Sequence, residues 1–406
     1  MRIIVLAGGS DQIPLIIELK KNNHYIILID YYDNPIAKPY VDKHLVVSTL
    51  DDLAVKKIAI KENVKYIITA CTDQALLTMA KVSEELNLPC YISHETALTV
   101  TNKTYMKKLM SENFIPTANY VITDEKSLIT CACNLKFPLI VKPADCNSSK
   151  GVKKILDKSC FKDNVTSAIS LSRTKSAIIE EYIIGDEISA DFYVQNGKVK
   201  LLLATCSKKI PNSVLFTILQ STFPIVSKDE EKEIVKIAQK IVDVFKLDNS
   251  PLILQLIKNQ TGFFVLEFSA RIAGGSKSKI IELLTGVNIM RVFINMIFGI
   301  KTFIQPKYKY DHALMNYIYC YPGIIHNFLN FEILKENKTI NEIFYYKTLN
   351  SKIIKSATSG DRAAGFLLLS NNKNDIIKRL KIVDNTIKII NSNGKDIMKH
   401  GLYTYR

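Results

Sequence analysis

The feature that most constrains the fold is a short segment in which polar side chains alternate with apolar ones before a glycine pair. It reads Val265-Leu-Glu-Phe-Ser-Ala-Arg-Ile-Ala-Gly-Gly275, so Glu267, Ser269 and Arg271 stand two residues apart. Side chains at this spacing lie on one face of an extended strand. The segment therefore predicts a strand with three polar groups on one face, followed by a turn.

The residues just upstream predict the partner strand of a hairpin. Leu252 to Lys258 is rich in apolar residues, and Asn259-Gln-Thr-Gly262 can form a turn in which the glycine takes positive φ. The hairpin would bring Gln255 across from Glu267. A carboxylate with neutral oxygen ligands suits Mg²⁺, and a nearby arginine can neutralise phosphoryl oxygens. This pattern indicates a metal–phosphate site, although a solvated strand face explains the segment alone equally well.

Further motifs stand upstream in a definite order. They are Thr101-Asn-Lys103, Phe137-Pro-Leu-Ile-Val-Lys142-Pro with the loop Asp145-Cys-Asn-Ser-Ser-Lys-Gly151, and Ile178-Ile-Glu-Glu-Tyr-Ile-Ile-Gly-Asp-Glu187. Each is a weak signal alone. Together with Glu-x-Ser-x-Arg-x-x-Gly-Gly, they make the chain resemble the ATP-grasp superfamily, in particular its carboxylate-amine ligases, L-amino-acid ligases and one half of a carbamoyl-phosphate synthase large subunit.

The resemblance implies ATP and Mg²⁺ as cofactors, with Mn²⁺ as an alternative ion. Lys142 ends an apolar strand, and the small residues after it allow backbone amides to approach phosphate oxygens closely. The resemblance implies that Arg271 acts at the transferring phosphoryl group. The implied phosphate and lid residues are Lys103, Lys142, Ser148, Ser149 and Gly151; the adenosine residues are Glu180, Tyr182, Ile183 and Glu187; and the metal ligands are Gln255, Glu267 and Ser269.

The predicted fold class is α/β with three domains. Short buried strands at Ile3–Ala7, Tyr25–Asp30, Leu45–Val47, Tyr66–Ala70 and Cys90–Ile92 alternate with helical stretches, which predicts a doubly wound parallel sheet over residues 1–99. Ala7-Gly-Gly-Ser10 followed by Asp30 is a weak dinucleotide-binding signal, because the third glycine is absent. By resemblance this is a pre-ATP-grasp domain whose Ser10, Thr72 and Asp73 face the substrate cleft.

The ATP-grasp module is expected at residues 100–300, with a mobile antiparallel lid at about 115–185. Residues 301–406 predict a small α+β C-terminal domain. Specificity is expected in the loops around the cleft. Gly274, Gly275 and Arg362 are further substrate candidates, because an arginine can bind a carboxylate bidentately. Arg362 could equally be a solvated turn residue. Lys277 and Lys279 could contact an anionic acceptor or could equally be solvated residues in the first turn of a helix.

Composition narrows the class of protein. Eight cysteines without a C-x-x-C pair and a start at Met1 without a leader pattern predict reduced thiols and a cytoplasmic location. The longest apolar run is too short to span a bilayer. The net charge of +15 comes without basic clusters interleaved with aromatics, so we expect anionic small-molecule substrates and neither a nucleic acid nor a membrane partner.

The expected function is an ATP-dependent ligase that activates a small carboxylate, such as an amino acid, as an acyl phosphate and couples it to an amine. Two alternatives stay open: a bicarbonate-activating carboxylase of the purine-pathway type, and a non-catalytic ATP-binding sensor or partner subunit. Ser269 stands where most relatives have asparagine, and Gln255 where many have an acid; both changes leave open whether one or two Mg²⁺ ions bind. A homodimer would be in keeping with such relatives.

Overall fold

The N-terminal part is a parallel sheet flanked by helices. The computed structural model describes residues 1–125, 127, 134–146, 150–211, 216–354 and 358–403. Its first sheet has the order β3-β2-β1-β4, built from β1 (Arg2–Leu6), β2 (Tyr25–Asp30), β3 (Lys43–Val46) and β4 (Tyr66–Ile68). The connecting elements are η1 (Ser10–Gln12), α1 (Ile13–Lys20), η2 (Lys38–Tyr40), α2 (Asp52–Lys61) and α3 (Asp73–Glu85). Parallel strands buried on both faces need apolar runs, which β1, β2 and β4 have, whereas the edge strand β3 is only half-buried.

One predicted strand of this sheet is wrong. Residues 90–92 form a bend without a ladder partner, and the Tyr91 hydroxyl donates a hydrogen bond to the Ala270 carbonyl at 2.9 Å. The apolar run there is used for packing between parts of the chain instead of for a fifth strand. The sheet therefore ends at β4, and α4 (His94–Thr101) and α5 (Lys103–Glu112) lead away from it.

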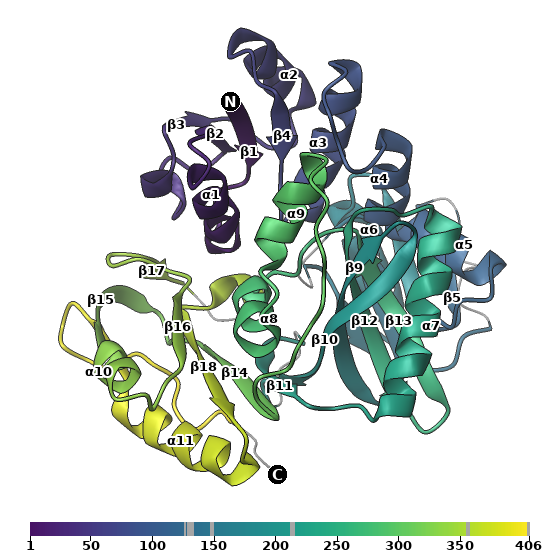
Figure 1. Ribbon diagram of the computed structural model, residues 1–406. Coiled ribbons are helices and arrows are strands. Elements are labelled where there is room, and N and C mark those ends of the chain that lie inside the picture. Colours follow the sequence, from purple (N-terminus) through teal and green to yellow (C-terminus); the bar gives the residue numbers. More distant parts are fainter. Residues whose placement is uncertain (126, 128–133, 147–149, 212–215, 355–357, 404–406) are drawn as a thin grey trace.

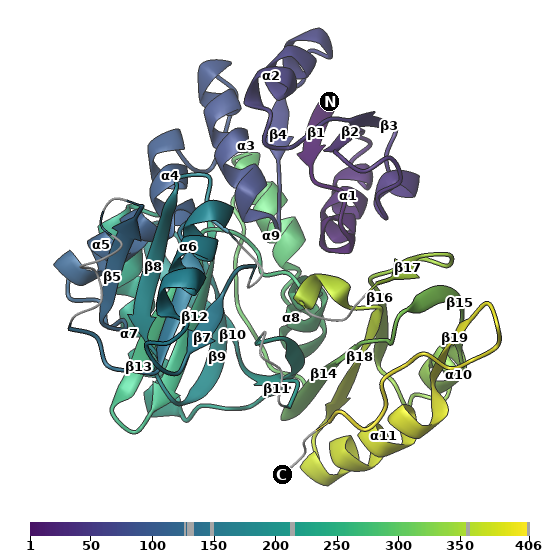
Figure 2. The same cartoon turned by 180° about the vertical axis from the view of Figure 1, so that it is seen from behind.

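A small antiparallel sheet follows, where the lid was expected. It has the order β5-β8-β6-β7, from β5 (Tyr120–Asp124), β6 (Leu139–Pro143), β7 (Lys153–Ile155) and β8 (Ser176–Glu181), and α6 (Phe161–Leu171) packs on it. Figure 2 shows α6 and β8 in front of β9 and β12, so this lid sheet lies over the larger sheet.

The larger sheet has eight strands in the order β13-β12-β9-β10-β11-β14-β18-β16. Its first half contains β9 (Asp186–Gln195), β10 (Lys198–Lys209), β11 (Ile218–Phe223), β12 (Pro251–Asn259) and β13 (Gly262–Ser269), with α7 (Lys228–Phe245) packed on one face (Figure 1). The predicted hairpin is confirmed, since Asn259 pairs with Gly262 and Gln255 pairs with Glu267.

The C-terminal part extends this same sheet, because β11 pairs with β14 (His312–Ile318). Beyond it lie β18 (Ala364–Ser370) and β16 (Glu342–Tyr345), while a separate sheet joins β15 (Gly323–Leu329), β17 (Lys352–Ile353) and β19 (Lys388–Asn391). The remaining helices are α8 (Lys277–Thr285), α9 (Ile289–Ile297), α10 (Phe331–Glu336), η3 (Ser359–Asp361) and α11 (Lys373–Thr386). The α/β architecture is confirmed, and the domain boundaries stay predictions.

Within the described ranges, no single helix is long and apolar enough to cross a membrane. Only α8 and α9 together reach that measure, and they are bent by 106° at the break between them.

Candidate active site

The hairpin of β12 and β13 places the predicted metal ligands next to one another. Gln255 lies directly opposite Glu267, and Ser269 is two residues further along β13. Their oxygen atoms are an amide carbonyl, a carboxylate and a hydroxyl, which together form a hard donor set that fits Mg²⁺. Among the described residues no three acids, histidines or cysteines cluster as a metal site, so any magnesium here would depend on these mixed oxygens.

Lys103 connects this hairpin to the loop after β6. Asn102 caps α5 by accepting a hydrogen bond from the Thr104 amide, which fixes the first turn of the helix. The Lys103 ammonium donates to the Cys146 carbonyl at 2.7 Å and lies 3.4 Å from Glu267 Oε2. A positive charge between the hairpin with the predicted metal ligands and the predicted phosphate loop could stabilise an anionic phosphate.

Lys142 and Glu180 form a buried ion pair across the lid sheet. The Lys142 ammonium donates to Glu180 Oε2 at 2.9 Å, and Lys107 of α5 approaches Glu180 Oε1 at 2.7 Å. Burial would raise the pKa of Glu180, but the charges of Lys107 and Lys142 outweigh it and lower the pKa to about 2. Glu180 is therefore a carboxylate at neutral pH, held between two lysines.

The other predicted nucleotide residues lie around the link between the lid sheet and β9. The Lys154 ammonium sits 3.6 Å from the centroid of the Tyr182 ring, and Glu187 pairs with Lys209 at 2.7 Å. Ile183 is half-buried beside Tyr182. Aromatic and apolar walls with a few charged groups suit a nucleoside.

Of the predicted phosphate-loop residues, Gly151 can be placed. Its φ is +76°, and a Cβ there would come within 2.8 Å of Leu171 and Pro143 side-chain atoms, so the position requires glycine. Ser148 and Ser149 lie outside the described residues.

Arg271 is joined to the N-terminal domain by a bidentate ion pair. Its Nε and Nη2 donate to the two carboxylate oxygens of Asp73 at 2.6 Å each, and Nη1 donates to the Ile272 carbonyl at 2.9 Å. Burial would raise the pKa of Asp73, but Arg271 outweighs it and lowers the pKa, helped by a hydrogen bond from Ser269. Asp73, predicted to face the substrate, thus fixes the orientation of the predicted catalytic arginine.

The glycine pair is held by a carboxylate that the sequence analysis did not single out. Asp11 accepts hydrogen bonds from the Gly275 and Ser276 amides at 2.9 and 2.8 Å, at the start of α8. Its neighbour Ser10 begins η1, and the Thr72 hydroxyl accepts a hydrogen bond from Gln12 at 3.3 Å. The two loops of the N-terminal sheet that were predicted to face the cleft therefore do meet the segment after β13.

Arg362 lies beside Gly275 in an aromatic cluster. Its guanidinium is centred 3.6 Å from the Tyr317 ring centroid and donates to the Tyr319 hydroxyl at 3.4 Å. A Cβ on Gly275 would come within 2.7 Å of the Tyr317 hydroxyl and 2.9 Å of Arg362 Nη1, so glycine is needed there too. The arginine is 9% exposed, its neighbouring titratable groups are tyrosines, and no carboxylate among the described residues forms an ion pair with it.

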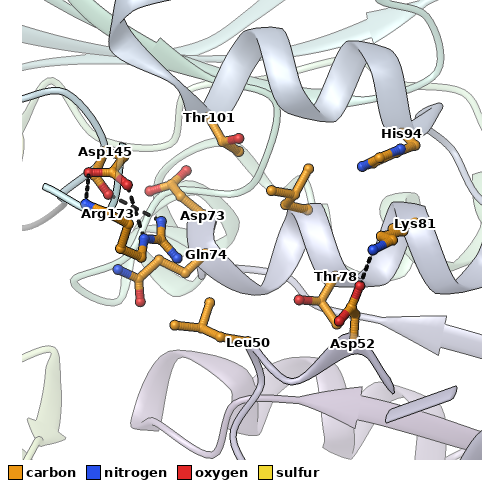
Figure 3. A pocket seen from close by; sticks show the side chains of 11 residues that line it. Leu50, Asp52, Asp73, Gln74, Thr78, Lys81, His94, Thr101, Asp145 and Arg173 are labelled. Carbon is orange, nitrogen blue, oxygen red and sulfur yellow. Dashed lines mark hydrogen bonds and ion pairs between the residues drawn. The ribbon is translucent and has the colours of Figure 1, made fainter. Parts of the chain in front are cut away.

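A cavity of about 220 Å³ opens between the N-terminal helices and the lid (Figure 3). Asp73 and Gln74 of α3 line one end of it, together with Arg173, whose Nε donates to Asp145 at 3.0 Å. Asp52, Lys81 and His94 line the other end. Asp73 therefore both lines the cavity and binds Arg271.

Sequence reasoning missed several residues that complete the site: Asp11, Lys107, Lys154, Lys209 and Tyr317. One signal was present, because Lys107 follows Lys103 by one helical turn and must lie on the same face. The others come from segments distant in sequence, and no spacing rule joins them.

Part of the chain matches a known protein family. Residues 135–279 match the family model of the ATP-grasp domain. The chain therefore contains an ATP-grasp domain over these residues, as the motifs indicated, and the matched span includes Lys142, the hairpin of β12 and β13, and the glycine pair.

The chain is similar over most of its length to several ligases and transferases. It is 25% identical over 251 residues to a formate-dependent phosphoribosylglycinamide formyltransferase of Sulfurisphaera tokodaii, covering 60% of this chain and 63% of that protein. It is 23% identical over 273 residues to an L-arginine-specific L-amino acid ligase of Bacillus subtilis, covering 64% and 66%. These alignments span less than two thirds of each relative.

Solved structures share the whole fold. An L-amino acid ligase from Bacillus licheniformis superposes with a TM-score of 0.80 at 17% identity, covering 97% of this chain and 99% of that one. The biotin carboxylase domain dimer of Hydrogenobacter thermophilus 2-oxoglutarate carboxylase, solved with MgADP and bicarbonate, gives a TM-score of 0.78 at 14% identity, covering 99% and 92%.

Proposed function

We propose that the protein is an ATP-dependent carboxylate-amine ligase. The observation that carries this proposal is Arg362, a guanidinium that is 9% exposed and has no carboxylate partner among the described residues. A buried charge without a counterion is costly unless a ligand completes it. Arg362 is therefore suited to a substrate carboxylate, held beside Gly275 and between tyrosine rings.

The chemistry follows from the difficulty of the reaction. A carboxylate cannot expel oxide when an amine attacks, so one of its oxygens first takes the γ-phosphoryl group of ATP, and ADP leaves. The amine then attacks the acyl carbon, phosphate leaves with the former carboxylate oxygen, and the amine proton goes to solvent or phosphate. Positioning and charge neutralisation account for most of such catalysis.

The residues have separate tasks in this scheme. Lys103 and Lys142 stabilise the phosphates, and Arg271, oriented by Asp73, stabilises the charge that develops on the transferring group. Gln255, Glu267 and Ser269 would hold Mg²⁺, which neutralises phosphate oxygens when bound. The relatives support this class, because an amino acid ligase and a formate-dependent formyltransferase are both named for a carboxylate substrate.

The proposed substrates are a small carboxylate, such as an amino acid, and a small amine. We also propose a homodimer, because the similar carboxylase domain was solved as a dimer. The test is ADP release from Mg-ATP with pooled carboxylates, with and without pooled amines, and separately with bicarbonate. We expect release that needs both a carboxylate and an amine. Release that needs bicarbonate would favour a carboxylase, and ATP binding without turnover in every pool would favour a non-catalytic protein.

Arg362→Met makes the test specific to this site. Loss of a charge-assisted contact should raise the KM for the carboxylate by roughly tenfold or more while leaving the KM for ATP within about twofold. Lys373→Met, an exposed position at the start of α11, is the control. An unchanged KM for the carboxylate in Arg362→Met would remove Arg362 from the substrate site.

A further inference from the structure

Lys107 is the most deeply buried charged side chain near the nucleotide lysines. Its side chain is 1% exposed, and it lies on α5 one turn after Lys103. The ammonium contacts the Thr117 hydroxyl, which in turn donates to the Val265 carbonyl at 2.8 Å. These contacts fix Lys107 between α5, the lid sheet and the strand that carries Glu267.

The charges around Glu180 do not balance. Two ammonium groups face this one carboxylate, Lys107 at 2.7 Å from Oε1 and Lys142 at 2.9 Å from Oε2. The Lys107 contact is an ion pair without hydrogen-bond geometry, whereas Lys142 donates a directed hydrogen bond. The three groups together hold one excess positive charge inside the protein.

Exposure indicates which lysine presents that excess charge. The side chains of Lys107 and Glu180 are 1% and 3% exposed, whereas the side chain of Lys142 is 9% exposed. Lys142 is also the second-last residue of β6, the strand before the predicted phosphate loop. Lys142 cannot serve as the sole counterion of Glu180 and also give its full charge to a phosphate, because each contact weakens the other. A second, fixed counterion removes that conflict.

We infer that Lys107 is a positioning residue for nucleotide binding: at neutral pH it neutralises Glu180, so that Lys142 is available to the phosphates of ATP. The inference rests on the proposed function only in taking ATP as the ligand. A purely structural Lys107 would support the packing of the lid and affect all ligands of the site alike. A positioning Lys107 affects phosphates selectively.

The experiment is direct binding to the full chain, by calorimetry, of Mg-ATP and of adenosine without any second substrate. In Lys107→Met, Glu180 would hold Lys142 as its only partner, so the Kd for Mg-ATP should rise about tenfold or more. The Kd for adenosine should change by less than about twofold, because adenosine has no phosphate for Lys142 to bind and Glu180 keeps Lys142 as its counterion. Equal weakening of both ligands, or none, would overturn the inference.

The matched control is Lys108→Met on the same helix. Lys108 is 67% exposed on its side chain and is 4.0 Å from Glu112, so its replacement removes a lysine without touching Glu180. We expect wild-type Kd values for both ligands. A loss of Mg-ATP affinity in Lys108→Met as large as in Lys107→Met would show that general charge, and not this position, is responsible.

The pH dependence of ligand binding to the wild-type protein is a second test, which can be made even if Lys107→Met folds poorly. Burial lowers the pKa of Lys107 to about 8, against the opposing effect of Glu180; Lys142 and Glu267 are the other charged groups that face it. Lys107 is thus charged below about pH 8 and neutral above it. Wild-type affinity for Mg-ATP should fall between about pH 7 and 9 more steeply than affinity for adenosine.

An equally flat profile for both ligands would contradict the inference. In Lys107→Gln the steep phase should disappear, whereas a merely structural lysine predicts the same profile at reduced stability. Neither outcome depends on turnover: a protein that binds Mg-ATP in this manner but releases no ADP contradicts the ligase proposal alone, and unchanged binding in Lys107→Met contradicts this inference alone.

Discussion

Glu267 carries the metal proposal at the level of the single residue. It lies opposite Gln255, and its side chain is 37% exposed, so its removal should cost the fold little. Glu267→Ala should reduce the rate of ADP release by at least about two orders of magnitude, the usual cost of losing a transition-state charge contact. Initial rates at saturating substrates and a thermal melt measure both effects.

The control for this variant is Glu95→Ala, which removes an exposed carboxylate from the first turn of α4. Turnover close to wild type in Glu267→Ala would show that magnesium is held elsewhere.

Arg271 differs from Glu267 because its ion pair with Asp73 is partly buried, with side-chain exposures of 16% and 13%. Arg271→Ala should lose turnover to a similar extent and also lower the melting temperature, since the partly buried Asp73 would lose its main partner. Kinetics and melting must be measured on the same preparation. A variant that lost stability but kept turnover would make this arginine structural.

Some of the site could be predicted from the sequence because its geometry is local. The turn at Asn259–Gly262 sets the strand register as far as Leu256 opposite Val265, and a register shift within the same hairpin then places Gln255 opposite Glu267. The surroundings of Arg362 could not be predicted, because its three tyrosines, Tyr317, Tyr319 and Tyr346, come from other segments of the chain. Lys277 shows the same limit: it is not a solvated lysine but is buried, 3.3 Å from Asp191.

At the level of elements, α7 packs on the larger sheet with an apolar face that includes Ile234, Ile237 and Ile241. Ser227 and Glu230 form a capping box at its start: each side chain accepts a hydrogen bond from the other residue's amide, at 3.3 Å to Ser227 and 2.7 Å to Glu230. The box satisfies amides that would otherwise have no partner in the helix.

Ser227→Ala should therefore lower the free energy of unfolding by about 1 kcal/mol. Denaturant unfolding compared with Lys236→Ala, an exposed position within α7, checks this. Equal stability of the two variants would mean that α7 does not limit unfolding.

Elements also show where pattern reasoning fails. The apolar run at residues 90–92 resembles a strand, yet the chain bends there and Tyr91 packs against Phe293. The pairing of β11 with β14, which continues one sheet into the C-terminal part, was likewise not predicted, since strand order depends on contacts between distant segments. The positions of strands in the sequence were therefore easier to predict than the strands with which they pair.

At the level of the whole molecule, the candidate site draws on all three parts of the chain. Asp11 and Asp73 come from the N-terminal part, and Glu267 and Arg271 from β13 and the segment after it. Arg362 comes from the C-terminal part. Figure 1 shows these parts around α8. A ligand that contacts several parts should stabilise the folded protein by mass action.

Mg-ATP at about one hundred times its Kd should stabilise the protein by about 2.7 kcal/mol and so raise the melting temperature. Removing the metal with a chelator should reduce the shift, because the phosphates would then face Glu267 without a neutralising ion. A thermal shift of equal size with and without the metal would contradict the proposed magnesium site.

The most direct test of the central claim follows the oxygen atoms. Once a carboxylate substrate is found, it is supplied with heavy-oxygen-labelled carboxylate groups, and the released phosphate is analysed by mass spectrometry. If the carboxylate is activated as an acyl phosphate, a labelled oxygen from it must appear in the phosphate. Unlabelled phosphate during full turnover would contradict carboxylate activation and with it the proposed ligase.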